Sequence, residues 1–486
     1  MLIKFIIIVP FVFGLVSFFI NNDFWRRALI VVCSAIHFFL TGLAWLNRPD
    51  SGLGDWFFLD NLGVIFLTIT SFLFLGASIY GIVYLADEKR KFDDEGKNFS
   101  REAIFSGCFL LFLSTMTIVT VSQHLAVLWA AIEATTLASA PLIYFHRTKR
   151  SLEATWKYLL ICSVGIALAL LGLFFLSVSN GSNQGNLVLS NMIQTPQGMN
   201  IVWLKAAFLL LFVGYGTKMG LAPFHTWLPD AHSEAPSVVS ALLSGALLNC
   251  ALLGILRAYQ VCLAAGLGSY CRDIFISFGL LSILFAAIFI LGQKDYKRML
   301  AYSSVEHMGI ITLGIGLGGQ AVYGSLISVI GHSLGKAGLF FVAGNIFAYS
   351  KTKTISEIQG LINGRTYYLG LFWMVGFLLI TATPPSAIFL GKFVILKEII
   401  FQGRYWIVVI FLTALALVFI GMARIFLSMT EGVTDNKNPN YSFGLRFFVQ
   451  ILPTTVFFGL IIAIGLYFPA GLKQQLETAA KMLGGF

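Results

Sequence analysis

The sequence predicts an all-α integral membrane protein that crosses the bilayer about fourteen times. Hydrophobic residues make up 58% of the 486 residues and charged residues only 11%, a balance that excludes a single soluble core. Apolar runs long enough to cross about 30 Å of hydrocarbon recur along the whole length. These runs lack the alternation that β-strands would show, so helices must satisfy the backbone inside the lipid.

The apolar runs follow one another with short loops between them and leave no stretch for a soluble domain. The predicted spans are residues 2–21, 26–46, 57–86, 103–120, 123–146, 155–178, 203–228, 237–262, 273–292, 299–317, 321–349, 367–400, 405–429 and 447–470. The chain is therefore expected to be one unit that spans the membrane many times.

Basic residues are distributed unevenly between the two sets of loops. The clusters at 89–91, 147–150 and 294–298 fall on one side, and the opposite loops hold only Arg48, Arg257, Arg272 and Arg404. Because basic loops face the cytoplasm, both termini and the uncharged stretch 179–200 are predicted outside. The net charge of +10 forms no basic face interleaved with aromatic residues, so nucleic acid is not an expected partner.

Motifs for redox centres, nucleotides and metals are missing from the sequence. The six cysteines form no C-x-x-C pair, and neither a phosphate-binding glycine loop nor an H-E-x-x-H helix is present. No cofactor or metal is expected, and any energy must come from a gradient or from a partner.

A few ionisable side chains are predicted near the middle of the spans, where each costs about 2.5 kcal/mol or more and needs a partner or water. They are Glu133, Lys218, His225, His307, His332, Lys336 and Lys392. A structural carboxyl group remains an alternative for Glu133, and a lysine that reaches the membrane surface remains one for Lys218. Lysine, histidine and glutamate all exchange protons near neutral pH when buried, so such a set favours proton relay.

The stretch "GYGTKMGLAPFHTWLPDAHSEAP" interrupts one of these spans with glycines and prolines around Lys218. A broken helix inside a membrane is tolerated where it lines a cavity. His225 either caps the second half-helix or carries protons. Asp230, His232 and Glu234 follow in the predicted loop, where structural and capping roles are expected.

The stretch "TATPPSAIFLGKFVILKE" repeats this device, with Pro384, Pro385 and Gly391 in an apolar run and Lys392 directly after the break. Two broken spans that lie five helices apart indicate two repeats, and an odd number of helices per repeat inverts the second. Between them, "GHSLGKAGLF" places His332 and Lys336 on one helical face, which favours a hydrated polar line.

Four motifs carry a family resemblance: "GTKMGLAPFHTWLPDAHSEAPSVVSALLSG", "DYKRMLAYSSVEHMG", "GHSLGKAGLFFVAG" and "TPPSAIFLGKF". The chain resembles the antiporter-like membrane subunits shared by respiratory complex I, Mrp-type cation/proton antiporters and energy-converting hydrogenases. Within that family it looks closest to the hydrogenase-4 or formate-hydrogenlyase type, component F. The resemblance implies fourteen helices, with helices four to eight (101–262) and nine to thirteen (263–430) as inverted repeats. Residues 1–100 then form a three-helix segment, and 431–486 the last helix and tail.

The resemblance also implies a central polar axis for protons. By position, Glu133 matches the glutamate of the fifth helix, Lys218 the lysine of the broken seventh, His332 the histidine of the eleventh and Lys392 the terminal lysine or glutamate of the twelfth; Lys336 follows that histidine in several members. One departure is in "SALLSGALLNCALLGILR", where Ser244 and Asn249 replace a titratable residue of the eighth helix. Either ordered water joins the two halves of the axis there, or the subunit transmits a conformational or electrostatic change without moving protons itself.

The leading interpretation is a proton- or sodium-translocating subunit of a redox-driven complex in a bacterial or archaeal plasma membrane, itself non-catalytic. Its expected partners are other membrane subunits, a peripheral redox arm and the lipid bilayer. The alternatives are an Mrp-type antiporter subunit or stand-alone transporter, and a scaffold whose polar residues only pack helices. For sodium, a cluster of carboxylates would be expected in place of the single Glu133.

Overall fold

The computed structural model describes residues 1–49, 55–93, 101–181, 185–363, 366–432 and 445–485, and within them the chain has isolated β-bridges but no strand. The basic side chains 89–91 and residues 182–184 of the uncharged stretch lie outside this description. The helices are α1 (Leu2–Phe19), α2 (Asp23–Leu46), α3 (Asn61–Asp93), α4 (Arg101–Val121), α5 (Leu125–Ile143), α6 (Lys149–Ser179), α7 (Leu189–Gln194), α8 (Ile201–Met219), α9 (Trp227–Glu234), α10 (Ser237–Leu242), α11 (Leu248–Ala264), α12 (Gly268–Leu291), α13 (Tyr296–Leu317), α14 (Gln320–Ser350), α15 (Tyr367–Ile380), α16 (Ala387–Phe401), α17 (Tyr405–Thr430), α18 (Leu445–Leu466) and α19 (Ala470–Lys481).

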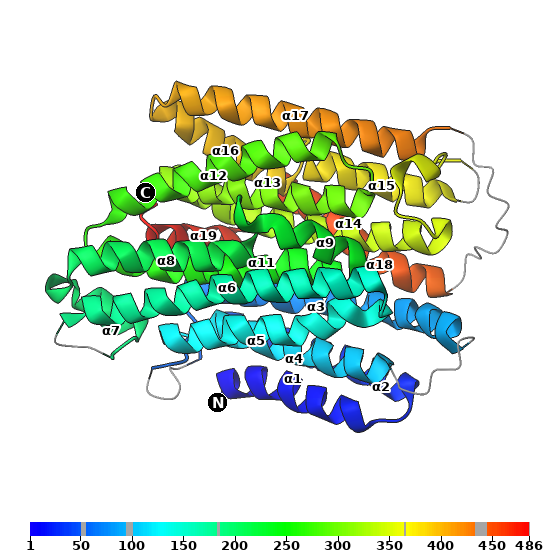
Figure 1. Cartoon of the computed structure of the whole chain (residues 1–486), viewed down its shortest axis with the longest axis horizontal. Helices are drawn as coiled ribbons and strands as arrows, with labels where there is room; N and C mark the ends of the chain where they lie inside the picture. The colour runs from blue at the N-terminus through cyan, green and yellow to red at the C-terminus, as the bar shows by residue number, and fades with distance from the viewer. Residues whose placement is uncertain (50–54, 94–100, 182–184, 364–365, 433–444, 486) are drawn as a thin grey trace.

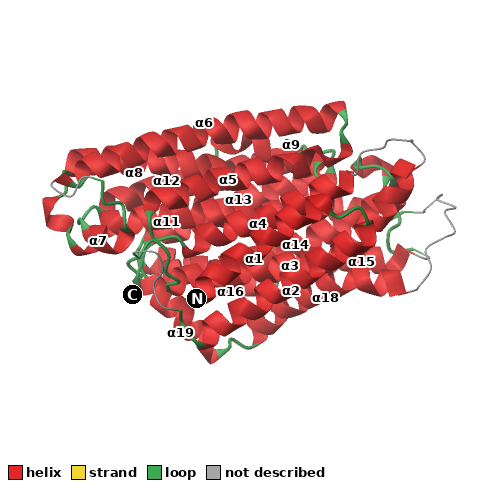
Figure 2. Cartoon of the chain, turned by 90° about the horizontal axis from the view of Figure 1, so that it is seen from below, coloured by secondary structure: helices red, strands yellow, loops and turns green. Residues whose placement is uncertain are grey.

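The long helices lie side by side along one direction, with α1 and α2 on one flank and α17 on the other (Figure 1). Both termini lie toward the same end of the bundle, as Figure 2 also shows from below. Local sequence sets several helix starts: side chains of Asn22, Asn200 and Asp295 accept backbone N–H groups of α2, α8 and α13.

The centre of the bundle is formed by α14 and by the continuous segment Ser237–Ala264, whose apolar windows are fully buried. Flanking helices expose large apolar side chains instead: Phe39, Val164 and Ile288 are each 64% exposed, and Val409 is 65% exposed. Apolar side chains on the outside and polar ones inside are what a lipid environment requires. The predicted all-α membrane class is confirmed.

In the described part of the chain, twelve helices are long and apolar enough to cross a membrane. The two further predicted spans coincide with α13, which carries Lys297, Arg298 and Glu306, and with the pair α15 and α16, of which α15 has only 14 residues. The count of fourteen and the inverted repeats therefore stay predictions.

The first predicted interruption is present between α8 and α9. Helix α8 ends at Met219, and Gly220 adopts a left-handed conformation (φ +80°) in which a side chain would be strained. A cis Ala222–Pro223 peptide and a short turn, Phe224–Thr226, lead into α9. Lys218 therefore lies in the last turn before the break.

The second interruption separates α15 from α16, and it differs from the prediction. The chain leaves α15 through Ala382 (φ +65°) and a cis Pro384–Pro385 peptide, and Ser386 caps α16. Lys392 does not come directly after the break but lies in the second turn of α16. Gly391 is a helical residue of α16, and its missing side chain lets α16 approach α14, because an added Cβ would lie 2.8 Å from the Gly324 carbonyl oxygen.

An ion pair joins Asp60, the residue before α3, to α11 at the end where the termini lie. The two terminal guanidinium nitrogens of Arg257 donate to Asp60, at 2.5 and 2.7 Å. Burial alone would raise the pKa of the Asp60 carboxyl, but the Arg257 guanidinium holds this pKa below its usual range. Arg257, which the sequence placed among the outer loop residues, is thus a buried helical residue.

Candidate functional site

The first group of polar residues joins α5 to the end of α8. The ammonium of Lys218 is fully buried and donates to the Ile132 carbonyl at 2.7 Å and to the Thr136 hydroxyl. Thr136 in turn donates to Oε2 of Glu133 at 3.1 Å. One hydroxyl therefore accepts from the lysine and donates to the glutamate, and it links the two titratable groups.

Glu133 lies close to the lateral surface of the bundle. It is half-buried, and its second carboxylate oxygen accepts a hydrogen bond of 3.2 Å from Ser163, an exposed residue of α6. Lipid tails offer no hydrogen bonds to such a group at mid-depth. A polar link thus reaches the outer face of the molecule at this point.

The polar groups form a row that runs from Glu133 on α5 to Lys392 on α16. The middle of this row is built from neutral side chains on α11 and its neighbours. The five residues Leu243–Leu247 form a π-helical turn, a feature frequent at functional sites. Within this turn, the Ser244 hydroxyl lies 2.8 Å from the Ser304 hydroxyl, and on α11 Asn249 donates to Ser333 at 2.8 Å. Helix α11 packs against α8 and α5, the helices that carry Lys218 and Glu133, so this neutral segment follows the first group.

The next group lies on α13 and α14. His332 directly precedes Ser333 on α14, and its ring centre lies 5.2 Å from that of His307. Neither ring nitrogen of His332 has a hydrogen-bonding partner among the described residues. The ammonium of Lys336, also on α14, donates to the Leu300 carbonyl at 2.8 Å. All three side chains are buried.

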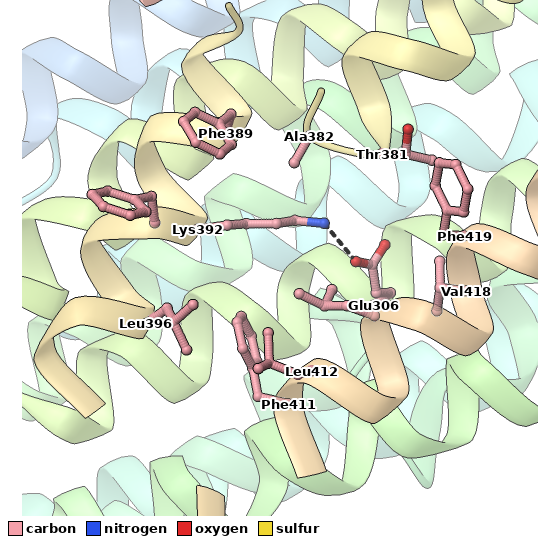
Figure 3. Close-up of a pocket in the computed structure, with 12 residues that line it drawn as sticks. Glu306, Thr381, Ala382, Phe389, Lys392, Leu396, Phe411, Leu412, Val418 and Phe419 are labelled. Carbon is pink, nitrogen blue, oxygen red and sulfur yellow. Dashed lines mark hydrogen bonds and ion pairs between the residues drawn. The ribbon is translucent and has the colours of Figure 1, made fainter. Parts of the chain in front are cut away.

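The last group contains a residue that the sequence reasoning missed. Glu306 of α13 is buried, and its Oε1 lies 2.8 Å from the Lys392 ammonium (Figure 3). Its Oε2 lies 2.8 Å from Nδ1 of His307. A usable signal existed, because Glu306 directly precedes His307 inside the predicted span 299–317.

The proton position on His307 follows from its neighbours. Nδ1 lies 2.8 Å from the Ser303 carbonyl oxygen, which can only accept, so Nδ1 carries the hydrogen of this bond; Oε2 of Glu306 is also 2.8 Å from Nδ1 but forms no hydrogen bond with it. In the neutral ring Nε2 is then an acceptor, and no described residue donates to it. His307 thus lies between the Glu306 carboxylate and His332, with its Nε2 free to accept a hydrogen bond.

A cavity of about 180 Å³ borders the pair formed by Glu306 and Lys392. The remainder of its wall is mostly aromatic and aliphatic, from the α15–α16 break, α16 and α17 (Figure 3). Phe393, Leu412 and Phe419 line it and are 52%, 46% and 45% exposed, so the cavity lies close to the lateral surface. The row of polar groups thus approaches the surface here as it does at Glu133.

His225 does not join the row by hydrogen bonds. Its ring is surrounded by Phe285, Phe289 and Tyr302, with centroid distances of 6.0, 6.5 and 5.9 Å, and Nδ1 has no partner among the described residues. Its assignment to the proton pathway therefore stays a prediction without a described connection.

Asp230, His232 and Glu234, which the sequence predicted in a loop after the first break, form part of α9 instead. Asp230 pairs with Lys157 at 3.0 Å and with Arg298 at 2.7 Å, and Glu234 pairs with Lys353 at 3.0 Å. His232 is instead fully buried, and neither of its ring nitrogens has a described partner.

Comparison with known proteins agrees with this architecture. Residues 122–418 match the family described as NADH:quinone oxidoreductase/Mrp antiporter, TM. A hydrogenase-4 component F homolog of Methylacidiphilum infernorum is 31% identical over 441 residues, which cover 88% of this chain and 89% of that protein.

Two solved structures are similar in fold. A chain of the archaeal membrane-bound sulfane sulfur reductase superposes with a TM-score of 0.84 at 19% identity, covering 99% of this chain and 98% of that one. A chain of the Mrp complex from Dietzia sp. DQ12-45-1b also gives 0.84, at 17% identity, covering 99% and 97%. A respiratory complex and an antiporter complex thus resemble this fold equally well.

Proposed function

We propose that this chain, which belongs to the NADH:quinone oxidoreductase/Mrp antiporter transmembrane family, moves protons through the membrane as one subunit of a larger redox-driven complex. It is an antiporter-like membrane subunit of the complex I and hydrogenase superfamily. The observation that carries the proposal is the row of buried polar groups from Glu133 to Lys392. Titratable groups stand at both ends of this row, and a neutral segment occupies its middle.

The two ends suggest how a proton is held and released. A buried ammonium beside a carboxylate is stable only while the pair is intact, because removal of one charge leaves the other uncompensated. Protonation of Glu306 therefore weakens the hold on the Lys392 proton. At the other end, the Thr136 hydroxyl couples the protonation of Glu133 to that of Lys218, because it is hydrogen-bonded to both.

The neutral middle, with Ser244, Asn249 and Ser333, contains no group that titrates near neutral pH. Hydroxyl and amide groups at hydrogen-bond distance order water, and the Asn249 Oδ1 atom has no partner among the described residues. Water at this point would connect the two halves. This favours a water bridge between the two halves over a subunit that transmits a change without moving protons.

The orientation of the chain belongs to the same proposal. Arg147, Lys297 and Lys353 line one cavity beside the start of α6, the start of α13 and the end of α14, and the basic-residue rule assigns this end of the bundle to the cytoplasm. Both termini then lie outside a bacterial or archaeal plasma membrane. The polar groups near both lateral surfaces support neighbouring membrane subunits on each side, since lipid would leave them without partners.

A second candidate function is cation/proton exchange in an Mrp-type assembly, and the fold similarity to the Mrp complex favours it. A sodium site would need several oxygen ligands without a competing cation. Glu306 is paired with Lys392, and Glu133 accepts hydrogen bonds from two hydroxyl groups, with no further carboxylate bound to it in the part of the chain that the structure describes. These contacts support protons over sodium ions.

The test is proton release per electron by the purified complex in vesicles. Glu306→Gln and Lys218→Ala are expected to abolish proton movement while part of the electron transfer remains. Glu398→Gln is the matched control, because Glu398 is a buried carboxylate of α16 that bonds Gln402 outside the row. Unchanged proton release in the first two variants contradicts the proposal. Sodium exchange by the isolated chain in vesicles would favour the Mrp-type alternative.

A further inference from the structure

Two cysteines face each other across the turn that joins α11 to α12. Cys262 lies in the last turn of α11 and Cys271 in the first turn of α12, and their side chains are 1% and 0% exposed. The Cys262 thiol interacts directly with the Cys271 thiol, and both are free thiols in the structure. This pair lies outside the row of polar groups from Glu133 to Lys392, so the proposed function does not account for it.

The backbone of the turn brings the two helix ends together. Gly266 adopts a left-handed conformation (φ +77°) and donates to the Leu263 carbonyl at 3.1 Å. Leu267 donates to the Cys262 carbonyl at 2.8 Å, which completes the usual pattern of a helix that ends in glycine. The Leu267 carbonyl in turn accepts from the Cys271 N–H at 3.2 Å. Two backbone hydrogen bonds through one residue therefore connect the two cysteines.

Side-chain contacts on either side of the thiols hold the helix ends in place. Tyr259 of α11 accepts from Nε of Arg272 at 3.3 Å and packs edge-on against Phe275, with ring centroids 5.1 Å apart. In the turn itself, an added Cβ at Gly268 would lie 3.0 Å from a methyl carbon of Leu263. A disulfide requires two backbone segments that approach closely and keep their positions, and these contacts provide both.

The pair lies at the end of the bundle where the chain termini lie (Figure 1). Arg272, the residue after Cys271, donates to the Gly484 carbonyl near the C-terminus at 3.4 Å. The orientation given with the proposed function places this end outside the plasma membrane, where disulfides form and persist. We propose that Cys262 and Cys271 form a structural disulfide in the assembled complex. The inference rests on that orientation.

The bond forms by exchange with an oxidant that itself carries a disulfide, such as a thiol oxidase of the outer compartment. The thiolate of one cysteine attacks the disulfide of the oxidant and forms a mixed disulfide, and the second thiolate then displaces the oxidant. Both cysteines lose their protons, two electrons pass to the oxidant, and the oxidant leaves as a dithiol. Because both thiols are buried in the folded chain, this exchange precedes the final packing of the end.

The position of the bond gives it a structural role. The sequence predicts residues 101–262 and 263–430 as two repeats, and the bond joins the last residue of the first to the first helix of the second. A cross-link at this boundary fixes how the two halves meet at the outer end. It also restricts the unfolded chain, so it stabilises the folded one.

The arginines that flank the pair make a direct test possible. Trypsin cleaves after Arg257 and Arg272 and releases residues 258–272, which contain both cysteines and no other. Cells that produce the complete complex are quenched in acid and then denatured with N-ethylmaleimide, which alkylates free thiols. We expect this peptide without maleimide and lighter by two hydrogens than its dithiol form. Cys250 of α11 is the matched control and should be alkylated in the same sample.

Thermal unfolding of the purified complex provides a second measurement. A reductant should lower the melting temperature of the parent by about 2 °C or more, because it removes the cross-link. The double variant Cys262→Ser/Cys271→Ser should melt at the same temperature with and without the reductant. A parent that shows no such dependence contradicts the inference.

The orientation is tested separately by Ser269→Cys in the double variant, because Ser269 is an exposed residue in the first turn of α12. A membrane-impermeant maleimide should label this cysteine on intact spheroplasts. If it is labelled there but the parent peptide 258–272 carries two maleimides, the inference is overturned and the proposed function stands. Labelling only after the membrane is opened overturns the orientation and the inference together.

Discussion

Lys218 and Lys392 are both buried lysines next to a broken helix, yet they are held by different partners. Lys218 lies before its break, in the last turn of α8, and donates to a carbonyl and a hydroxyl; the carboxylate of Glu133 is reached only through Thr136. Lys392 lies after its break and contacts the Glu306 carboxylate directly at 2.8 Å.

This difference separates two ways to hold a proton in a membrane. Carbonyl and hydroxyl acceptors suit an ammonium and also a neutral amine, since both forms carry N–H donors. A buried carboxylate suits only the ammonium, because a neutral amine would leave the carboxylate uncompensated. The Lys218 site thus tolerates both protonation states, and the Lys392 site depends on a simultaneous change at Glu306. The two halves of the chain are therefore not interchangeable.

Removal of each carboxylate should break the comparison most clearly. Glu306→Gln leaves the Lys392 ammonium buried without its partner, so we expect a loss of about 3–5 kcal/mol in stability. Glu133→Gln keeps both acceptors of Lys218 and should cost about 1 kcal/mol. Thermal unfolding of the purified protein in detergent measures both variants.

A double variant provides the control for that prediction. Glu306→Gln combined with Lys392→Met removes both charges, and its stability should recover relative to Glu306→Gln alone. Equal melting temperatures for Glu306→Gln and Glu133→Gln would mean that the two lysines do not differ in the way proposed.

The glycines next to the two lysines provide a smaller test, this time of packing. At Gly391 an added Cβ would lie 2.8 Å from the Gly324 carbonyl oxygen of α14, whereas at Gly216 the nearest atom is a Leu221 methyl carbon at 3.4 Å. Gly391→Ala should cost about 1–3 kcal/mol through overpacking, and Gly216→Ala should be nearly neutral. The melting temperatures of the two variants test this difference in stability. A larger loss of stability in Gly216→Ala than in Gly391→Ala would contradict the close approach of α16 to α14.

The sequence predicted the parts of this site that depend on local composition. Glycines and prolines in apolar runs indicated both breaks, and isolated charges within the spans indicated Lys218, Lys392 and Glu133. Such signals need no knowledge of neighbouring helices, because a charge in an apolar span needs a partner or water whichever helix supplies it.

The partners themselves could not be predicted in this way. Glu306 and Lys392 are 86 residues apart, and their contact depends on how α13 and α16 are rotated about their axes. The same holds for the bond between Asn249 and Ser333 and for the stacking of His232 on Phe340. His225 shows the reverse case: the motif suggested a pathway residue, and the fold surrounds it with aromatic rings.

The smallest expected effect concerns the hydroxyl that joins Lys218 to Glu133. Thr136→Val keeps the shape of the side chain but removes both hydrogen bonds, so we expect a cost of about 1 kcal/mol in stability and slower proton movement with electron transfer retained. Thr136→Ser retains the hydroxyl and should restore the parent rate. Proton release per electron in vesicles distinguishes the two variants. A parent rate in Thr136→Val would show that Lys218 exchanges protons with Glu133 by another route, and the difference between the two lysine sites would then rest on Glu306 alone.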